Sequence, residues 1–251
     1  MSIKFDDKHL FFDNYNANFY KYNNDLYKIY KIYIPEELEV QLMYNESIHN
    51  KVDQHIILPT ELLYGENDWL IGYKMNYVEG IDLEKEIKQQ NFSFEDKIFF
   101  INDMFNLLRE AHNYLIVGDI RNSNIMIGKD KSAYLIDLDY AKKLDAIGTP
   151  FCRYHIYHHD EALNNKNEDI IKMYISTLSL LYNYNIEHSF SRFENIDALE
   201  MYIPFSGLLQ DYYYHIRDCI NKHQDIKYLN IPFDNNIERE LNTAKSRILY
   251  K

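Results

Sequence analysis

The chain has 251 residues, of which 46% are apolar and 16% aromatic, and it carries a formal net charge of −12. This apolar fraction is sufficient for one core or for two lobes that share a cleft, and it is too high for a disordered chain. The negative charge, without a basic stripe, argues against a general nucleic-acid binder.

The N-terminal stretch MSIKFDDKHLFFDN contains acids where a secretory signal would be basic, and no run approaches the roughly 18 apolar residues of a membrane span. The two cysteines, Cys152 and Cys219, have no close spacing and no paired histidines in zinc-finger order, so neither a disulfide scaffold nor a structural zinc site is expected. We therefore expect a cytoplasmic protein that does not bind a membrane.

The segment 9–34 alternates aromatic or aliphatic residues with polar ones and is interrupted twice by Asp and Asn clusters. This pattern predicts short antiparallel strands joined by tight turns. Pro35, followed by three nearby glutamates, predicts a helix that runs to about His49, because proline suits the first turn and acids suit the positive end of the helix dipole. Apolar runs on either side of residues 65–68 predict a further hairpin.

A change of character near residue 80 indicates a hinge. Residues 77–80 leave the predicted sheet, and a helical stretch at 81–90 follows. We expect a strand-rich lobe with one helix over residues 1–80 and a helical lobe over residues 81–251. Together they form one domain of the α+β class.

The second lobe contains the clearest helical pattern of the chain. Ser93 and Asp96 form a capping pair, and apolar residues then recur at steps of three and four, which predicts a long helix that ends near Tyr114. After a loop at 140–167, a second helix carries an apolar face on Ile171, Ile175, Leu178 and Tyr182. The remaining residues are typical of further amphipathic helices.

Three polar residues surround one small hairpin in the stretch GDIRNSNIMIGKDKSAYLIDLDYA, which covers residues 118–141. Asn124 follows Asp119 by five residues, and Asp137 follows thirteen residues later. In phosphoryl transfer, one carboxylate orients the proton of an attacking hydroxyl, while an amide oxygen and a second carboxylate hold Mg²⁺ against the triphosphate. We expect Asp119 in the first role, and Asn124 and Asp137 as the metal ligands.

These residues resemble the protein kinase superfamily over about residues 10–183. GDIRNSN is similar to the catalytic loop, NIMI and AYLI to the strand pair after it, and IDLDYA to the metal-binding segment. The resemblance implies a two-lobed kinase-like fold and an enzyme that transfers the γ-phosphate of ATP, with Mg²⁺, to a hydroxyl of a protein or a small molecule.

The same resemblance assigns roles outside the hairpin. In MNYVEGIDL, Met75 would be the gatekeeper, and the backbone from Asn76 to Val78 would bind adenine. Lys28 would contact the α- and β-phosphates, and Arg121 would stand where Ser/Thr-type kinases place a lysine that touches the transferred phosphate.

Alternatives remain for three of these assignments. Lys31 lies three residues after Lys28 and so points to the other strand face; Lys28 is preferred because it shares its face with apolar residues. The helix partner of Lys28 would be Glu39 or Glu37, with Glu39 preferred because it lies deeper in the helix. Asp169 matches the buried aspartate that ties the catalytic loop to the core, but an acidic first turn explains it equally well.

Three departures separate the sequence from typical protein kinases. NYNANFYKYNN replaces the Gly-x-Gly loop, Val117-Gly118 replaces the usual His-Arg, and the closing Ala-Pro-Glu is missing although GTP at 148–150 resembles part of that region. Gly118-Asp119 and the D-x-D of Asp137 and Asp139 are similar to aminoglycoside and choline kinases. The alternatives are therefore a small-molecule kinase and a non-catalytic pseudokinase scaffold.

The histidines His155, His158 and His159 have spacings that suggest a metal site. Nearby acids are few and no second cluster completes such a site. A polar activation loop is the preferred interpretation.

Overall fold

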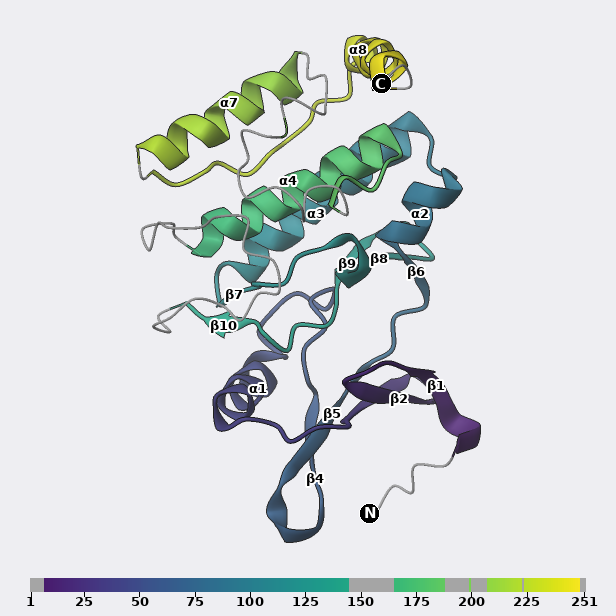
Figure 1. Cartoon of the computed structure of the whole chain (residues 1–251), viewed down its shortest axis with the longest axis vertical. Coiled ribbons are helices and arrows are strands. Elements are labelled where there is room, and N and C mark those ends of the chain that lie inside the picture. The colour runs from purple at the N-terminus through teal and green to yellow at the C-terminus, as the bar shows by residue number, and fades with distance from the viewer. Residues whose placement is uncertain (1–6, 145–164, 188–198, 200–206, 223, 249–251) are drawn as a thin grey trace.

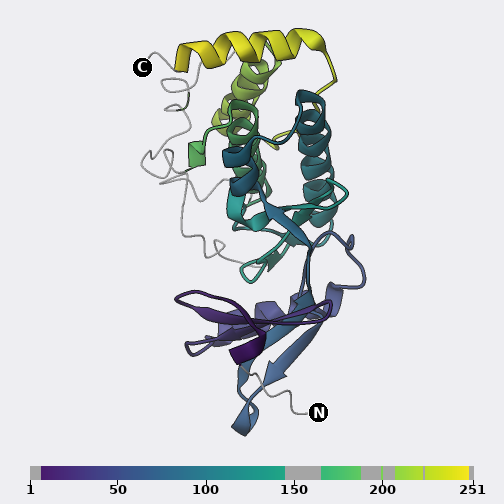
Figure 2. The ribbon, with the colours of Figure 1, turned by 90° about the vertical axis from the view of Figure 1, so that its right-hand side faces the viewer.

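The computed structural model describes residues 7–144, 165–187, 199, 207–222 and 224–248. These residues form a small lobe built on an antiparallel sheet and a larger, mainly helical lobe (Figure 1). The side view in Figure 2 shows the sheet lobe at one end of the molecule and the long helices at the other. The predicted α+β, two-lobed class is confirmed.

The small lobe contains a five-stranded sheet in the order β1-β2-β3-β5-β4, with every neighbouring pair antiparallel. Helix α1, Glu36–Ile48, follows β3 as predicted, with Pro35 at its N-cap. The five strands are β1 Leu10–Asp13, β2 Ala17–Tyr22, β3 Asp25–Tyr30, β4 Glu61–Tyr64 and β5 Leu70–Asn76.

Two residues of this sheet suit special local requirements, one for backbone conformation and one for space. The β2–β3 turn places Asn23 at φ 55°, a left-handed conformation that asparagine tolerates better than most residues. In β5, a Cβ added at Gly72 would lie 2.0 Å from the carbonyl oxygen of Lys28. Glycine at this position therefore lets β5 pair closely with β3 next to Lys28.

The larger lobe is organised around two long helices, α3 and α4. The Ser93 hydroxyl and the Asp96 carboxylate form the predicted capping box at the start of α3. The apolar stripe of α3 then lies at the centre of the core and packs against α4. The helices are α2 Leu83–Gln89, α3 Phe94–Ala111, α4 Asn165–Tyr182, α7 Leu208–Asn221 and α8 Asn235–Ile248.

Two short sheets lie between the helices and the first lobe. Strands β6 Gly80–Asp82, β8 Ile125–Gly128 and β9 Ala133–Leu135 form an antiparallel sheet in the order β6-β8-β9. Strand β7, Leu115–Ile116, pairs with β10, Lys142–Lys143. Strand β10 lies within residues 140–167, which were predicted to be a loop. The helix predicted at 81–90 is also shorter than expected, because Asp82 ends β6 and caps α2 by accepting a hydrogen bond from Lys85 N.

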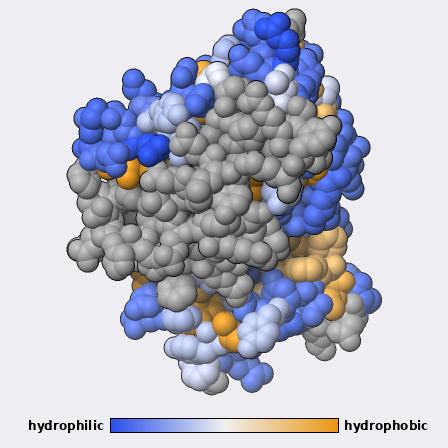
Figure 3. All heavy atoms as spheres, turned by 45° about the horizontal axis from the view of Figure 1, so that its top comes forward, coloured by the Kyte–Doolittle hydropathy of each residue, from blue (hydrophilic) through white to orange (hydrophobic). Residues whose placement is uncertain are grey.

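Each lobe contains its own cluster of buried apolar residues. The smaller cluster includes Leu42, Tyr73 and Met75, and the larger one is built on α3, α4 and α7. Outside the grey atoms, Figure 3 shows a mainly hydrophilic surface over α7 and α8. None of the helices in the described ranges has the length and apolar character needed to cross a membrane.

Candidate active site

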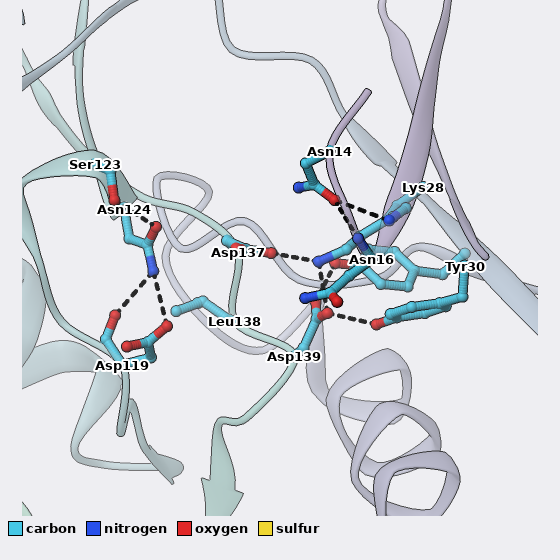
Figure 4. Close-up of polar contacts among 12 residues, drawn as sticks. Asn14, Asn16, Lys28, Tyr30, Asp119, Ser123, Asn124, Asp137, Leu138 and Asp139 are labelled. Atoms are coloured by element: carbon cyan, nitrogen blue, oxygen red, sulfur yellow. Dashed lines mark hydrogen bonds and ion pairs between the residues drawn. The ribbon is translucent and has the colours of Figure 1, made fainter. Parts of the chain in front are cut away.

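Lys28 lies in a buried cluster of opposite charges. Its side chain comes from β3 and is 5% exposed, and its Nζ lies 2.6 Å from Asp139 Oδ2 and also contacts Asp137 Oδ1 (Figure 4). Burial alone would lower the pKa of Lys28, but Asp139 and Asp137 outweigh it and raise that pKa above its ordinary value. Lys28 is therefore a permanent cation in this site.

Two tyrosines complete the surroundings of Asp139. Tyr30, two residues after Lys28 on the same face of β3, donates its hydroxyl to Asp139 Oδ2. Tyr73, the β5 residue paired with Lys28, donates its hydroxyl to Asp139 Oδ1. Burial and the nearby Asp139 raise the pKa of both phenols well above 10, so both remain donors.

Asp137 adopts an unusual backbone conformation at the edge of this cluster. Its φ is 57°, a region that costs a non-glycine residue about 1–2 kcal/mol and is often retained at functional sites. Its side chain is 38% exposed, whereas that of Asp139 is 5% exposed. Burial raises the pKa of Asp137, but Lys28 and, more weakly, Arg121 outweigh it, so the net shift is downward.

Asp119 and Asn124 form a second group, on the loop between β7 and β8. The short 3₁₀ helix Asn122–Asn124 turns the chain back, so that Asn124 Nδ2 donates to Asp119 O at 2.9 Å and to Asp119 Oδ2 at 3.2 Å. Arg121 Nη2 also donates to Asp119 Oδ2. The amide nitrogen of Asn124 is therefore used by Asp119. The side-chain oxygen of Asn124, Oδ1, remains for other partners and accepts a hydrogen bond from Ser123 Oγ at 3.2 Å.

The oxygen atoms of Asn124 and Asp137 are hard ligands of the type that Mg²⁺ prefers, and one or two protein carboxylates suffice for a magnesium–phosphate site. The donor chemistry therefore fits the predicted metal. In Figure 4, Asp137 lies between the Asp119–Asn124 pair and Lys28.

Asp169, the fifth residue of α4, anchors the start of the Asp119 loop. It is 1% exposed and accepts hydrogen bonds from the backbone N–H groups of Val117 at 2.7 Å and Gly118 at 2.8 Å. His112 Nε2 lies 3.0 Å from the same carboxylate. Of the two interpretations of Asp169, the structure supports the buried tie to the loop, because a solvated first-turn acid would not be enclosed in this way.

No family model matches the sequence, and a search of curated proteins finds no match. Among solved structures, the ROP18 kinase domain in complex with AMP-PNP and sucrose is similar over 96% of this chain and 82% of that chain. The TM-score is 0.62 and the sequence identity is 11%. The chain has the protein-kinase fold. At this identity the likeness concerns the fold alone, and it agrees with the sheet lobe and helical lobe described above.

The structure does not bring Lys28 together with its predicted helix partner. Among the residues that the structure describes, the carboxylates in contact with Lys28 are those of Asp137 and Asp139. Burial and, more weakly, Glu39 raise the pKa of Tyr64, and burial lowers the pKa of Lys142 against the opposing effect of Glu37. Glu37 is exposed and Glu39 only partly buried, whereas Lys28 is buried between its two aspartates.

The segment that connects the lobes of the kinase fold contains the predicted nucleotide-binding residues. Met75 is 5% exposed and packs in the core of the small lobe, while Asn76 ends β5. Val78 lies between β5 and β6 and packs against the same core. Their contacts with adenine stay a prediction.

The β1–β2 turn occupies the place of the glycine-rich loop. Asn14 Oδ1 accepts hydrogen bonds from Asn16 N at 2.9 Å and Ala17 N at 2.8 Å, so the side chain takes up backbone donors of the turn. Lys31 Nζ donates to Asn14 O at 2.7 Å and pairs with Asp13 at 3.2 Å. Lys31 thus has a structural position at the turn, away from the contacts of Lys28.

Sequence reasoning missed four residues around the catalytic loop. Lys172 Nζ donates to Gly118 O at 2.7 Å, and Asn122 N donates to Glu187 at 2.8 Å, where burial raises the pKa of Glu187. His112, the C-cap residue of α3, is 2% exposed, and its spacing from the apolar residues of α3 was the available signal. Asp139 was noticed only as part of the D-x-D pattern. The segment GTP at 148–150, Cys152 and the histidines at 155, 158 and 159 lie outside the described residues.

Proposed function

We propose that this protein is a phosphotransferase that binds ATP with Mg²⁺ and transfers the γ-phosphate to a hydroxyl acceptor. The observation that carries the proposal is the contact of Lys28 with Asp137 across 109 residues of sequence, beside the Asp119–Asn124 loop. Four residues of the types that phosphoryl transfer requires thus lie in one region of a kinase-like fold (Figure 4). The similar ROP18 domain was solved with AMP-PNP, an analogue of ATP, which supports a nucleotide as the ligand.

Each residue has a distinct role in this proposal. Asp119 accepts the proton of the attacking hydroxyl, whose oxygen forms a bond to the γ-phosphorus while the bond to the bridging β–γ oxygen breaks. Lys28 neutralises charge on the α- and β-phosphates, and Arg121 contacts the transferred phosphate. Asn124 and Asp137 hold Mg²⁺, which supplies charge neutralisation at the phosphates when bound.

A protein hydroxyl is the favoured acceptor because Arg121 stands two residues after Asp119, as a lysine does in Ser/Thr-type kinases. The second candidate is a small-molecule kinase. It is favoured by Gly118, whose φ of 80° is a conformation that glycine adopts without strain and that the usual arginine would not.

Magnesium-dependent nucleotide binding tests the proposal. We would measure ATP affinity by calorimetry with and without Mg²⁺, for the wild type, Lys28→Met and Asp137→Asn. Lys222→Met is the matched control, because Lys222 forms an exposed pair with Asp218 on α7. The proposal expects Mg²⁺-dependent binding that Lys28→Met and Asp137→Asn weaken and the control retains. A wild type without affinity for Mg-ATP contradicts it.

A further inference from the structure

Asp139 is a buried acid beside Lys28, with an exposed fraction of 4%. Both of its carboxylate oxygens are used: Oδ1 accepts from Tyr73, and Oδ2 accepts from Lys28 and Tyr30. All three donors come from adjacent strands of the small lobe, β3 and β5, whereas Asp139 belongs to the segment between β9 and β10. The carboxylate therefore joins the sheet to the segment that follows the Asp137 position.

The two partners of Lys28 differ in accessibility. The Asp139 side chain is 5% exposed and has no room for a further ligand, whereas the Asp137 side chain is 38% exposed. A metal that binds Asp137 would share this carboxylate with Lys28, so Asp137 alone would not fully neutralise the ammonium. Asp139 would remain as the counter-ion that keeps Lys28 in place.

Helix α1 contacts this segment with an amide instead of an acid. Asn45 is fully buried, and its Nδ2 donates to Leu138 O at 3.1 Å and to Ala141 O at 3.4 Å, on either side of Asp139. One turn earlier on the same face of the helix stands Gln41, which is neutral. The helix thus fixes the backbone around Asp139 and presents no charge at these two positions.

We propose that Asp139 is the positioning residue of Lys28, and that it takes the place of a carboxylate on helix α1. The proposal rests on the proposed function, because the position it sets is that of Lys28 against the nucleotide phosphates. Asp139 holds the ammonium while Asp137 is engaged by the metal. The alignment of Lys28 then depends on the contact between the β3–β5 sheet and the Asp139 segment, and does not depend on a movement of α1.

A double-mutant cycle on nucleotide affinity tests this role, because residues that act through one another are not additive. The affinity for Mg-ATP would be measured for the wild type, Asp139→Asn, Lys28→Met and the double variant. We expect Asp139→Asn to weaken binding about tenfold or more in the wild type and by less than about threefold when Lys28 is already methionine. Glu39→Gln is the matched control and should bind as the wild type does.

Each other outcome overturns a defined statement. If the wild type does not bind Mg-ATP, the proposed function and this inference both fail. If the wild type binds and Asp139→Asn binds equally well, only the inference fails. An equal loss of affinity on both backgrounds would mean that Asp139 acts on the fold and not through Lys28. If Glu39→Gln loses as much affinity as Asp139→Asn, the carboxylate on helix α1 also positions Lys28, and the inference fails.

Tyr73→Phe keeps the test decisive if Asp139→Asn does not fold, which near-ultraviolet circular dichroism would reveal. This variant retains the carboxylate and removes one of its donors. It should weaken nucleotide binding several-fold on the wild-type background and leave the affinity of Lys28→Met unchanged. Wild-type affinity for Tyr73→Phe in that case overturns the inference.

Discussion

Asp169 accepts a hydrogen bond from the backbone N–H of Gly118 at 2.8 Å, although 51 residues separate the two. Lys172, one turn further along α4, donates to the carbonyl oxygen of the same glycine at 2.7 Å. Both the N–H group and the carbonyl oxygen of Gly118 are thus hydrogen-bonded to side chains of α4. The position of Asp119, the next residue, is therefore set by the most buried part of the larger lobe.

Asp169→Ala should destabilise the protein strongly. It leaves the N–H groups of Val117 and Gly118 buried without an acceptor, and each unsatisfied group costs about 1–3 kcal/mol. We expect the free energy of unfolding in urea to fall by about 2–5 kcal/mol. Asp218→Ala, which removes an exposed i,i+4 pair on α7, should cost less than about 0.5 kcal/mol. Similar losses for the two variants would show that Asp169 does not anchor the loop.

Gly72→Ala should disturb the small lobe next to Lys28. The added methyl would lie 2.0 Å from a backbone oxygen of β3, so the strands must separate, and forced overpacking of this kind costs about 1–3 kcal/mol. The expected result in thermal denaturation is a clearly lower melting temperature. At Gly65 the nearest atom to an added methyl is a flexible side-chain carbon of Ile71 at 2.9 Å, so Gly65→Ala should cost less. The reverse order of the two variants would contradict the β3–β5 pairing.

The ionic contacts of Lys28 predict how the stability of the wild type depends on pH. In the wild type the pKa of Asp137 is lowered, so its contribution is present above the unfolded value near 4 and is lost as pH falls through the folded pKa. The pKa of Lys28 is raised, so its contribution is present below about 10.4 and is lost only at higher pH. The ionic stabilisation should therefore be constant from about pH 5 to pH 9.

Lys28→Met leaves Asp139 buried without its cation and should cost about 3–5 kcal/mol at pH 7. Without the ammonium the pKa of Asp137 loses the main cause that lowers it, so Asp137 gains a proton more readily and this deficit should shrink as pH falls from 7 toward 4. Urea denaturation of both proteins across this range measures the effect. A difference that does not change with pH would show that the pair carries no ionic stabilisation.

Local patterns were sufficient for much of this fold. The capping box of Ser93 and Asp96 and the apolar steps that follow specify α3 without reference to the rest of the chain. Asp119 and Asn124 likewise lie on one short loop, and the amide of Asn124 donates a hydrogen bond to the backbone oxygen of Asp119. Both predictions depend on residues that are close in sequence.

The features that sequence reasoning missed depend on tertiary contacts. The carboxylates that meet Lys28 come from residues 137 and 139, and the glutamates near the start of α1 give no indication of that pairing. The role of Asp139 arises only when β3 and β5 pack against a segment more than a hundred residues away from β3. Strands β7 and β10 have two residues each, too few for an alternating pattern to be visible.

Phosphate transfer itself tests the central claim most directly. The wild type and Asp119→Asn would be incubated with Mg-ATP, and ADP formation and the intact protein mass would be followed together. We expect turnover by the wild type that Asp119→Asn lowers by about 10² to 10⁴, with ATP affinity retained. Phosphate found on the protein would favour a protein acceptor. Equal turnover by the two proteins, or none by a wild type that binds Mg-ATP, would contradict the account.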